Sequence, residues 1–235
     1  MQIYEKPLQI TSEYTAMNGY VRTSSLLALL QAAAGQSAEN LGAGKAVTSD
    51  QGILWMIVHM RVEITRLPKY FEQVTIRTWP GEGKHGIYPR YYELWDAGEN
   101  LIVAASGSWV LVDAATRSLL PPDAVTLPAT VTGREISLPK RIRTPELSSL
   151  GGFTVQYSQA DINGHMNNAK YLDAVEDAMP VEYLMSHRLK AVSVDYLHEV
   201  IPGEHVTLGS AQIDDAWYFE GATHEPCFRV KLEYN

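Results

Sequence analysis

Hydrophobic positions in the first forty residues predict one long buried helix. It is expected to begin with Thr23 or Ser24 as its N-cap and to stop at Gly42 or Gly44. Its apolar residues occupy more than one side, which is typical of a helix enclosed by a sheet. The stretch therefore predicts the centre of a fold and not a surface helix.

A second helix is predicted after Asn167 and Asn168, which are candidate caps. Its apolar positions recur at helical spacing: Tyr171, Leu172, Val175, Ala178 and Met179. The remaining apolar segments are rich in β-branched and aromatic residues, and several alternate with polar ones, which predicts half-buried antiparallel strands. These expected strands are 53–65, 72–79, 87–96, 102–113, 190–197, 205–213, 217–224 and 227–234.

The sequence repeats itself at two offsets. Residues 18–21 (NGYV) align with residues 163–166 (NGHM), an offset of 145 (163 − 18). The stretch from Arg61 aligns with the stretch from Ser193, an offset of 132 (193 − 61), which pairs Glu72 with Glu204. We therefore expect two copies of a unit in which a helix precedes an antiparallel sheet. The first copy is residues 1–130, the linker 131–150 and the second copy 151–235.

Composition narrows the class of protein. The chain has 235 residues, one cysteine (Cys227) and a formal net charge of −8. A single cysteine allows no intrachain disulfide, and no global positive charge is present to attract nucleic acid or an anionic membrane. No apolar stretch approaches the length of about 20 residues that crosses a bilayer. We expect a cytoplasmic protein with no nucleic-acid partner and no membrane insertion.

One short segment carries the residue types of an acyl-transfer site. Asp161, Asn163 and His165 alternate along what is predicted to be an extended stretch, so that they point the same way, just before a helix N-terminus. Thioester hydrolysis needs an activated nucleophile, donors for the oxyanion and a proton for the leaving thiolate. A carboxylate, an amide and an imidazole supply these groups. Each residue taken alone has a structural alternative, as a helix cap or a hydrogen-bonded histidine.

The chain resembles the plant and bacterial acyl-acyl-carrier-protein (acyl-ACP) thioesterases. Segments similar to that family occur in the family's order over most of the chain, among them GKHGIYPR, SGSWVLVDAATRSLLPP and DINGHMNNAKYLDAVEDA. The resemblance implies an α+β tandem (double) hot-dog fold, in which each half is an antiparallel sheet wrapped around a long central helix. It also implies hydrolysis of fatty acyl-ACP to a free fatty acid and holo-ACP.

The same resemblance implies a fourth site residue, Glu199, at the end of the segment YLHE. In the resembling enzymes, the residues matching Asp161, Asn163, His165 and Glu199 form the site. We expect Glu199, oriented with His165, to activate water, Asn163 to bind the thioester carbonyl or the water, and Asp161 to fix the loop. Direct attack by Asp161 remains an alternative. A carboxylate on the second helix, Glu176 or Asp177, is a further alternative, because some single-hot-dog thioesterases keep theirs there.

The repeat predicts a single active site, carried by the second half. At the two offsets the first half has Ala16, Tyr20 and Leu67 where the second has Asp161, His165 and Glu199, and Asn18 alone is retained. The first half is therefore expected to form the acyl-chain cavity. The expected lining is Leu26, Leu29, Leu30, Trp55, Met56 and Val58.

Acyl carrier protein is acidic, so a protein of charge −8 must meet it through a local basic surface. The candidate cluster is Arg134, Lys140, Arg141 and Arg143 in the linker, with Arg188 and Lys190 as a second choice. No metal-ligand spacing or phosphate-binding loop occurs, so we expect no cofactor and no metal.

Three other functions are compatible with the fold: acyl-CoA thioesterase, enoyl-thioester hydratase and acyl-binding module. The spacing of Asp161 and His165 also satisfies the hydratase pattern, whereas the tandem asparagines and Glu199 favour the hydrolase. The chain length, the saturation and the choice between ACP and CoA are left open. So is the oligomeric state, for which a monomer and a homodimer are both compatible.

Overall fold

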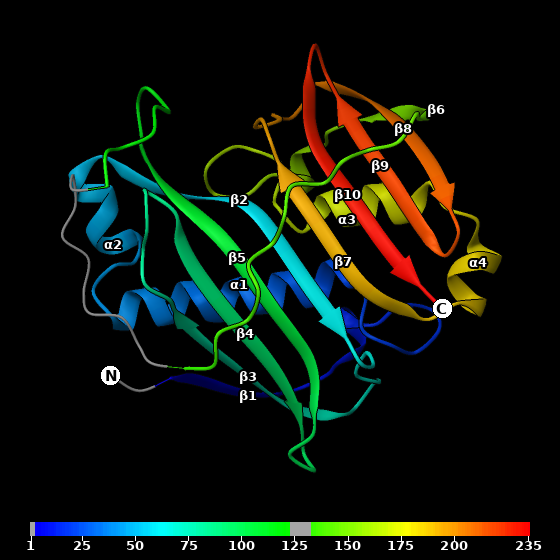
Figure 1. Cartoon of the computed structure of the whole chain (residues 1–235), viewed down its shortest axis with the longest axis horizontal. Helices are drawn as coiled ribbons and strands as arrows, with labels where there is room; N and C mark the ends of the chain where they lie inside the picture. The colour runs from blue at the N-terminus through cyan, green and yellow to red at the C-terminus, as the bar shows by residue number, and fades with distance from the viewer. Residues whose placement is uncertain (1–2, 123–132) are drawn as a thin grey trace.

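The computed structural model describes residues 3–122 and 133–235. The strands in this part of the chain form one antiparallel sheet in the order β1-β3-β4-β5-β2-β7-β10-β9-β8-β6. Figure 1 shows α1 and α3 against the same face of this sheet, with β4, β5 and β2 crossing in front of α1 and with β10 and β9 crossing in front of α3. This arrangement confirms the expected α+β tandem hot-dog fold.

Each half begins with a strand, continues through helices and ends with four further strands. The first half consists of β1 (Tyr4–Gln9), α1 (Thr23–Asn40), α2 (Lys45–Thr48), β2 (Ile53–Ile64), β3 (Gln73–Pro80), β4 (Tyr88–Asp96) and β5 (Leu101–Asp113). The second half consists of β6 (Ser148–Thr154), α3 (Lys170–Asp177), α4 (Val181–Ser186), β7 (Leu189–Tyr196), β8 (His205–Ile213), β9 (Ala216–Ala222) and β10 (Pro226–Tyr234). Short 3-10 turns occur at Ser12–Tyr14, Ser49–Gln51 and Tyr157–Gln159.

The two edge strands, β1 and β6, were not predicted. β1 contains adjacent charges and a proline, and β6 contains the pair Gly151 and Gly152, so neither has a strong strand pattern. Such residues are common at sheet edges, where a strand pairs on one side only. β6 also begins at Ser148, inside the segment 131–150 that was expected to be linker.

The helices differ in detail from the prediction. Arg22 occupies the N-cap of α1, and the expected caps Thr23 and Ser24 lie inside the helix with buried side chains. The helix of the second half is short: α3 has 8 residues and ends before Pro180, which has no backbone N–H to continue it. As expected of an enclosed helix, α1 is buried on several sides, with Leu27 and Leu30 at 0% exposure.

The internal repeat is confirmed by equivalent hydrogen bonds. Gly19 N–H donates to the Ala16 carbonyl at 2.9 Å, and Gly164 N–H donates to the Asp161 carbonyl at 3.0 Å, each glycine having a positive φ. Glu72 and Glu204 have the same local role, because each carboxylate accepts the backbone N–H of the residue three positions earlier. The pairing of Glu72 with Glu204 in the repeat therefore reflects a shared role in a turn.

The halves join through β2 and β7, which pair antiparallel. Arg61 and Ser193, which correspond in the repeat, face each other in this ladder, and the Arg61 guanidinium donates to the Ser193 hydroxyl at 3.0 Å. Equivalent residues meet in this way where a twofold axis crosses an interface. The chain therefore contains an internal version of an isologous dimer contact, and its sheet is continuous across it.

The linker crosses the outer face of the sheet, the face turned away from α1 and α3 (Figure 1). Arg134 forms an ion pair with Glu93 at 2.8 Å, the Ser106 hydroxyl donates to the Ser137 carbonyl at 2.7 Å, and Ile142 N–H donates to Asp195 Oδ2 at 2.7 Å. These contacts attach the linker to β4, β5 and β7 in turn. Among the described residues, no helix combines the length and apolar character needed to span a membrane.

Candidate active site

The segment that contains Asp161, Asn163 and His165 is a tight turn and not the extended stretch predicted from the alternation. Asp161 N–H donates to the His165 carbonyl at 2.9 Å, and Gly164 at φ 83° closes the turn. Glycine suits this position because the left-handed region is unfavourable for other residues. The turn precedes α3 by a few residues, and Ala169 N–H donates to the Asn167 side chain at 2.9 Å, a cap-like contact.

Asp161 holds Asn163 through both carboxylate oxygens. Asn163 N–H donates to Oδ1 at 2.8 Å, and Asn163 Nδ2 donates to Oδ2 at 3.3 Å. The side-chain oxygen Oδ1 of Asn163 in turn accepts a hydrogen bond at 3.2 Å from Nζ of Lys45, the first residue of α2. An acceptor on the nitrogen side and a cation on the oxygen side fix the orientation of this amide. One Nδ2–H remains for another acceptor.

His165 contacts the carboxylate that the family resemblance assigned as base. His165 Nε2 lies 3.1 Å from Glu199 Oε2, and the side chains are 18% and 29% exposed. The two residues approach because the turn is fastened to the segment after β7: Met166 N–H donates to the Val200 carbonyl at 2.7 Å. The site is thus half-buried, with both groups within reach of water.

Two cations from the first half also reach this cluster, and the sequence did not predict them. Arg117 Nε lies 3.5 Å from Glu199 Oε2, the oxygen that contacts His165, and Lys45 bonds Asn163 as described above. Arg117 sits at φ 59° in a turn after β5, and the Asp113 carboxylate organises this turn by accepting two backbone N–H groups. A non-glycine residue in the left-handed region is unusual and is often found at functional sites.

The four predicted residues therefore lie in one region of the structure, where they form two pairs. Asp161 with Asn163 is one pair, and His165 with Glu199 is the other. Within the described part of the chain, no group of three His, Cys, Asp or Glu side chains has the arrangement of a metal site.

Glu176, the helix alternative, lies apart from these pairs. It accepts a hydrogen bond from Thr23 Oγ1 at 2.5 Å, which joins α3 to α1. Burial raises the pKa of Glu176 to about 7, with the Thr23 hydrogen bond opposing that effect and the neighbouring Asp173 and Asp177 charges adding to it. This carboxylate is an interior contact between the helices.

The basic candidates separate into two groups. Arg134 is paired with Glu93 and forms part of the linker's attachment. Lys140, Arg141 and Arg143 are exposed on both sides of the buried Ile142, which is anchored to Asp195 near the end of β7. Glu199 follows Asp195 by four residues. Lys140, Arg141 and Arg143 therefore lie near the end of β7 that leads to the candidate site.

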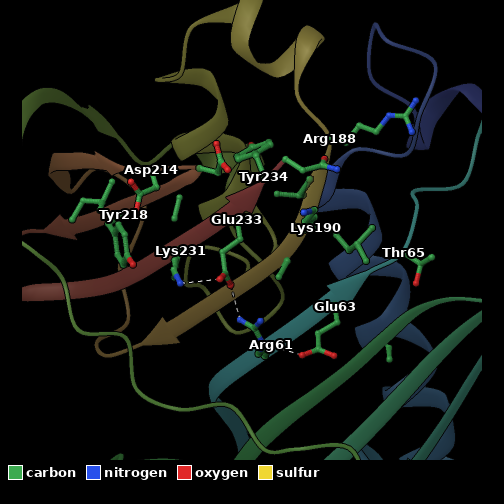
Figure 2. Close-up of a pocket in the computed structure, with 18 of the residues that line it drawn as sticks. Arg61, Glu63, Thr65, Arg188, Lys190, Asp214, Tyr218, Lys231, Glu233 and Tyr234 are labelled. Atoms are coloured by element: carbon green, nitrogen blue, oxygen red, sulfur yellow. Dashed lines mark hydrogen bonds and ion pairs between the residues drawn. The ribbon is translucent and has the colours of Figure 1, made fainter.

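A groove of about 940 Å³ lies on the outer face, at the opposite end of β7. Figure 2 shows its run of ion pairs, Lys231 with Glu233, Glu233 with Arg61 and Arg61 with Glu63, at 2.9, 2.8 and 3.3 Å. Arg188 and Lys190, the second basic candidate, also line it, together with Asp214 and Asp215. None of Asp161, Asn163, His165 and Glu199 does. β7 has 8 residues, so Arg188, just before its start, is about 25 Å from the end of the strand that leads to the site. The charges that line the groove are mixed.

Comparison with known proteins identifies the family. The model of the acyl-ACP thioesterase N-terminal domain matches residues 1–124, and that of the C-terminal domain matches residues 143–227. The chain belongs to the acyl-ACP thioesterase family. The matched C-terminal region contains all four predicted site residues, while Lys45 and Arg117 lie in the matched N-terminal region.

Curated relatives are distant and longer. The oleoyl-acyl carrier protein thioesterase of Coriandrum sativum is 25% identical over 234 residues, which is 90% of this chain and 63% of that protein. The palmitoyl-acyl carrier protein thioesterase of Cuphea hookeriana is 26% identical over 159 residues, 63% of this chain and 38% of that protein. The chain thus aligns with less than two thirds of the length of these chloroplastic relatives.

Solved structures share the fold along the whole chain. An acyl-ACP thioesterase from Bacteroides thetaiotaomicron superposes with a TM-score of 0.92 at 20% identity, covering 99% of this chain and 98% of that one. The 12:0-ACP thioesterase from Umbellularia californica gives 0.81 at 18% identity, covering 99% and 97%. At these identities the comparison establishes the tandem hot-dog fold.

Proposed function

We propose that this protein hydrolyses the thioester of fatty acyl chains carried by acyl carrier protein, releasing the fatty acid and holo-ACP. The observation that carries the proposal is the 3.1 Å contact between His165 and Glu199. These residues come from separate segments of the chain, the turn before α3 and the segment after β7. Membership of the acyl-ACP thioesterase family supports the same reaction.

The geometry assigns a role to each group. A water molecule attacks the thioester carbonyl carbon while Glu199, oriented by His165 and Arg117, accepts its proton. The carbonyl oxygen gains negative charge, and the unused Nδ2–H of Asn163 donates to it. The carbon–sulfur bond then breaks, and the proton returns through the His165–Glu199 pair to the leaving thiolate.

Asp161 fits a positioning role better than direct attack. Both of its carboxylate oxygens already accept hydrogen bonds from Asn163, at 2.8 and 3.3 Å. A nucleophilic oxygen would have to give up one of these bonds to approach the carbonyl carbon. We therefore assign Asp161 to orienting the amide.

Thiol release from acyl-ACP, acyl-CoA and acyl-pantetheine thioesters tests the reaction. His165→Ala and Glu199→Gln are each expected to lower kcat about 10²- to 10⁴-fold, the range of general acid–base catalysis. His198→Ala is the matched control, because this neighbouring histidine is half exposed and pairs with Glu225 at 3.4 Å. Turnover that survives both site substitutions would refute the assigned site. Hydrolysis confined to CoA esters would favour the acyl-CoA thioesterase, and hydration of enoyl thioesters without hydrolysis would favour the hydratase.

The acidic carrier protein is proposed to dock on Lys140, Arg141 and Arg143. Their support is exposure and position: the backbone between them is fixed to Asp195, and β7 leads from there to the site. Arg134 contributes less, because Glu93 already neutralises it.

Charge reversal tests the docking surface. The double variant Arg141→Glu and Arg143→Glu is expected to raise KM for acyl-ACP about tenfold or more, with little change for acyl-pantetheine, and to weaken the salt dependence of kcat/KM. Arg188→Glu, on the distant groove, is the control. An equal effect of both variants on acyl-ACP would contradict the assignment.

The acyl chain is proposed to lie in the first half, between α1 and the sheet. Leu26, Leu29 and Leu30 of α1 belong to the packed core there, at 1%, 8% and 0% exposure. Neither the outer groove nor the smaller one beside Trp79 is lined by these leucines. Chain-length preference measured on Leu26→Ala and Leu30→Ala tests this placement, and an unchanged preference in both would refute it.

A further inference from the structure

The interior of the first half contains polar side-chain atoms whose hydrogen bonding is incomplete. Arg90 Nη2, Tyr92 OH and Trp109 Nε1 are buried without a hydrogen bond of standard geometry in the described structure, and Tyr92 and Trp109 interact with each other through a weaker contact, so that Arg90 Nη2 has no partner. Arg90 is 8% exposed and Tyr92 is fully buried. Buried donors are almost always paired, so unpaired ones grouped in one place require an explanation.

These groups lie on the helix-facing side of the sheet. Along β4, Arg90 alternates in phase with Tyr92 and Leu94, which belong to the core. Glu93 lies on the opposite, outer face, where it pairs with Arg134 of the linker. Trp109 of β5 packs against the same core. The region proposed to receive the acyl chain is therefore not purely apolar.

The Arg90 guanidinium has no carboxylate partner among the described residues. Its single hydrogen bond within the described residues runs from Nε to Thr78 Oγ1 at 3.1 Å. The Thr78 hydroxyl in turn donates to the Tyr91 carbonyl at 2.8 Å. Burial lowers the pKa of Arg90, with Tyr92 opposing that effect, and burial raises the pKa of Tyr92 to about 12. Tyr92 thus stays a neutral hydroxyl, and the guanidinium lacks a counter-charge.

Further buried polar groups connect this cluster with the candidate active site. Tyr196, at the end of β7, donates its hydroxyl to the Asn168 carbonyl at 3.1 Å, just after the catalytic turn. Burial raises the pKa of Tyr196, and Tyr92 adds to this effect while Gln31 of α1 opposes it. Gln31 Nε2 is also buried, and its contact with Tyr196 falls short of standard hydrogen-bond geometry. Polar atoms therefore continue from the site into the first half.

The sheet register gives the separation. Arg90 faces Gly107, Gly107 faces Met60, and Met60 faces Val194 of β7. Three strand spacings separate Arg90 from Val194, about 14 Å. This places Arg90 at the depth where the far part of an acyl chain attached at the site would lie.

We propose that Arg90, Tyr92 and Trp109 form a subsite for an oxygen atom carried on the far part of the acyl chain, as a carboxylate, hydroxyl or keto group. The inference rests on the proposed thioesterase function and specifies its substrate class. The subsite is rich in donors and contains one unneutralised cation, so it is complementary to an acceptor oxygen. A plain hydrocarbon chain would leave Arg90 Nη2 without an acceptor.

The experiment compares matched thioesters of ACP from octanoyl to hexadecanoyl, each with a plain, an ω-hydroxy or an ω-carboxy end. The wild-type protein is expected to favour one oxygenated series over the plain chain of equal length by about tenfold or more in kcat/KM. Preference for the carboxylate assigns the contact to the Arg90 charge, and preference for the hydroxyl assigns it to the neutral donors.

Variants locate the effect. Arg90→Met should abolish the preference, and Tyr92→Phe, which removes one hydroxyl and keeps the ring, should reduce it. Arg229→Met is the control, because this strand arginine pairs with Glu220 at 2.7 Å in the other half. Plain chains hydrolysed as well as oxygenated ones at every length would overturn the subsite while leaving the thioesterase function in place.

A binding measurement separates the two proposals. If no thioester is hydrolysed, the proposed function fails, and calorimetry with free ω-hydroxy, ω-carboxy and plain fatty acids then decides the subsite. Binding of an oxygenated acid at least tenfold tighter than the plain acid, lost in Tyr92→Phe or Arg90→Met, supports it. Equal binding of all three acids refutes it.

Discussion

At the scale of single residues, two side chains of the candidate site are each held in place by two neighbouring side chains. Asn163 is held between the Asp161 carboxylate and Lys45, and Glu199 lies between His165 and Arg117. Paired groups of this kind stay in one orientation, which is the condition for donors and bases to act without reorganisation. The site is therefore sensitive to residues that do not contact the substrate.

Arg117 offers the direct test at this scale. Arg117→Gln is expected to lower kcat about 10- to 100-fold by releasing the Glu199 carboxylate, since small displacements of a reacting group have effects of that size. KM should change little, and Arg117→Lys should restore part of the rate. Steady-state kinetics check this, with Arg66→Gln, whose partners Glu72 and Asp96 lie at the sheet's other end, as control. A rise in KM at constant kcat would contradict the positioning role.

At the scale of elements, the two helices differ although they are repeats. α1 has 18 residues and is enclosed by the sheet, whereas α3 has 8 and is followed by α4 after Pro180. The hydrogen bond between Thr23 and Glu176 connects them in the interior. A carboxylate at such a place favours the protonated form, because burial disfavours its charge.

This contact predicts a pH dependence of stability. The folded protein binds the Glu176 proton more tightly than the unfolded chain, since the pKa rises from 4.5 to about 7. Proton binding at Glu176 therefore contributes about 3 kcal/mol to the free energy of unfolding. This contribution is complete below pH 4.5 and is lost as the pH rises toward 7.

Urea denaturation at several pH values measures this contribution. Glu176→Gln should become more stable relative to the wild-type protein as the pH rises from 4.5 to 7, with no further change above. Glu182→Gln, at an exposed position of α4 that is not among the charges acting on Glu176, should follow the wild-type profile. Parallel profiles for the Glu176 variant and the wild type would contradict the buried position of the carboxylate.

At the scale of the whole molecule, the ten strands of the described residues form one sheet because β2 and β7 pair at the internal twofold. The linker contacts β7, one of these two paired strands, on the outer face of the sheet. Asp195 of β7 is 1% exposed and accepts from Ile142 N–H at 2.7 Å, while His59 Nδ1 of β2 lies 2.8 Å from its other oxygen. One carboxylate thus joins both halves and the linker.

Asp195→Ala is expected to destabilise the protein by about 2–4 kcal/mol, because it leaves a buried backbone N–H and the His59 ring without their acceptor. Glu146→Ala, an exposed linker residue, should have little effect. Thermal denaturation measures both. A loss below about 0.5 kcal/mol for Asp195→Ala would mean that the linker attachment does not stabilise the fold.

The sequence by itself determined the repeat, the strands with clear alternation and the long helix, because burial imposes periodicity on those segments. It also predicted the candidate set of Asp161, Asn163 and His165, which lies within five consecutive positions, and the resemblance added Glu199. The edge strands escaped prediction because they pair on one side only.

Only the tertiary structure decided which first-half residues contact the candidate site residues. Lys45 and Arg117 precede His165 by more than forty residues, and no spacing rule relates them to it. The turn geometry of Asp161 to His165 was likewise hidden, because alternating polar residues are compatible with a strand and with a turn. Contacts of this kind arise from the pairing of β2 with β7, a long-range event that local patterns do not encode.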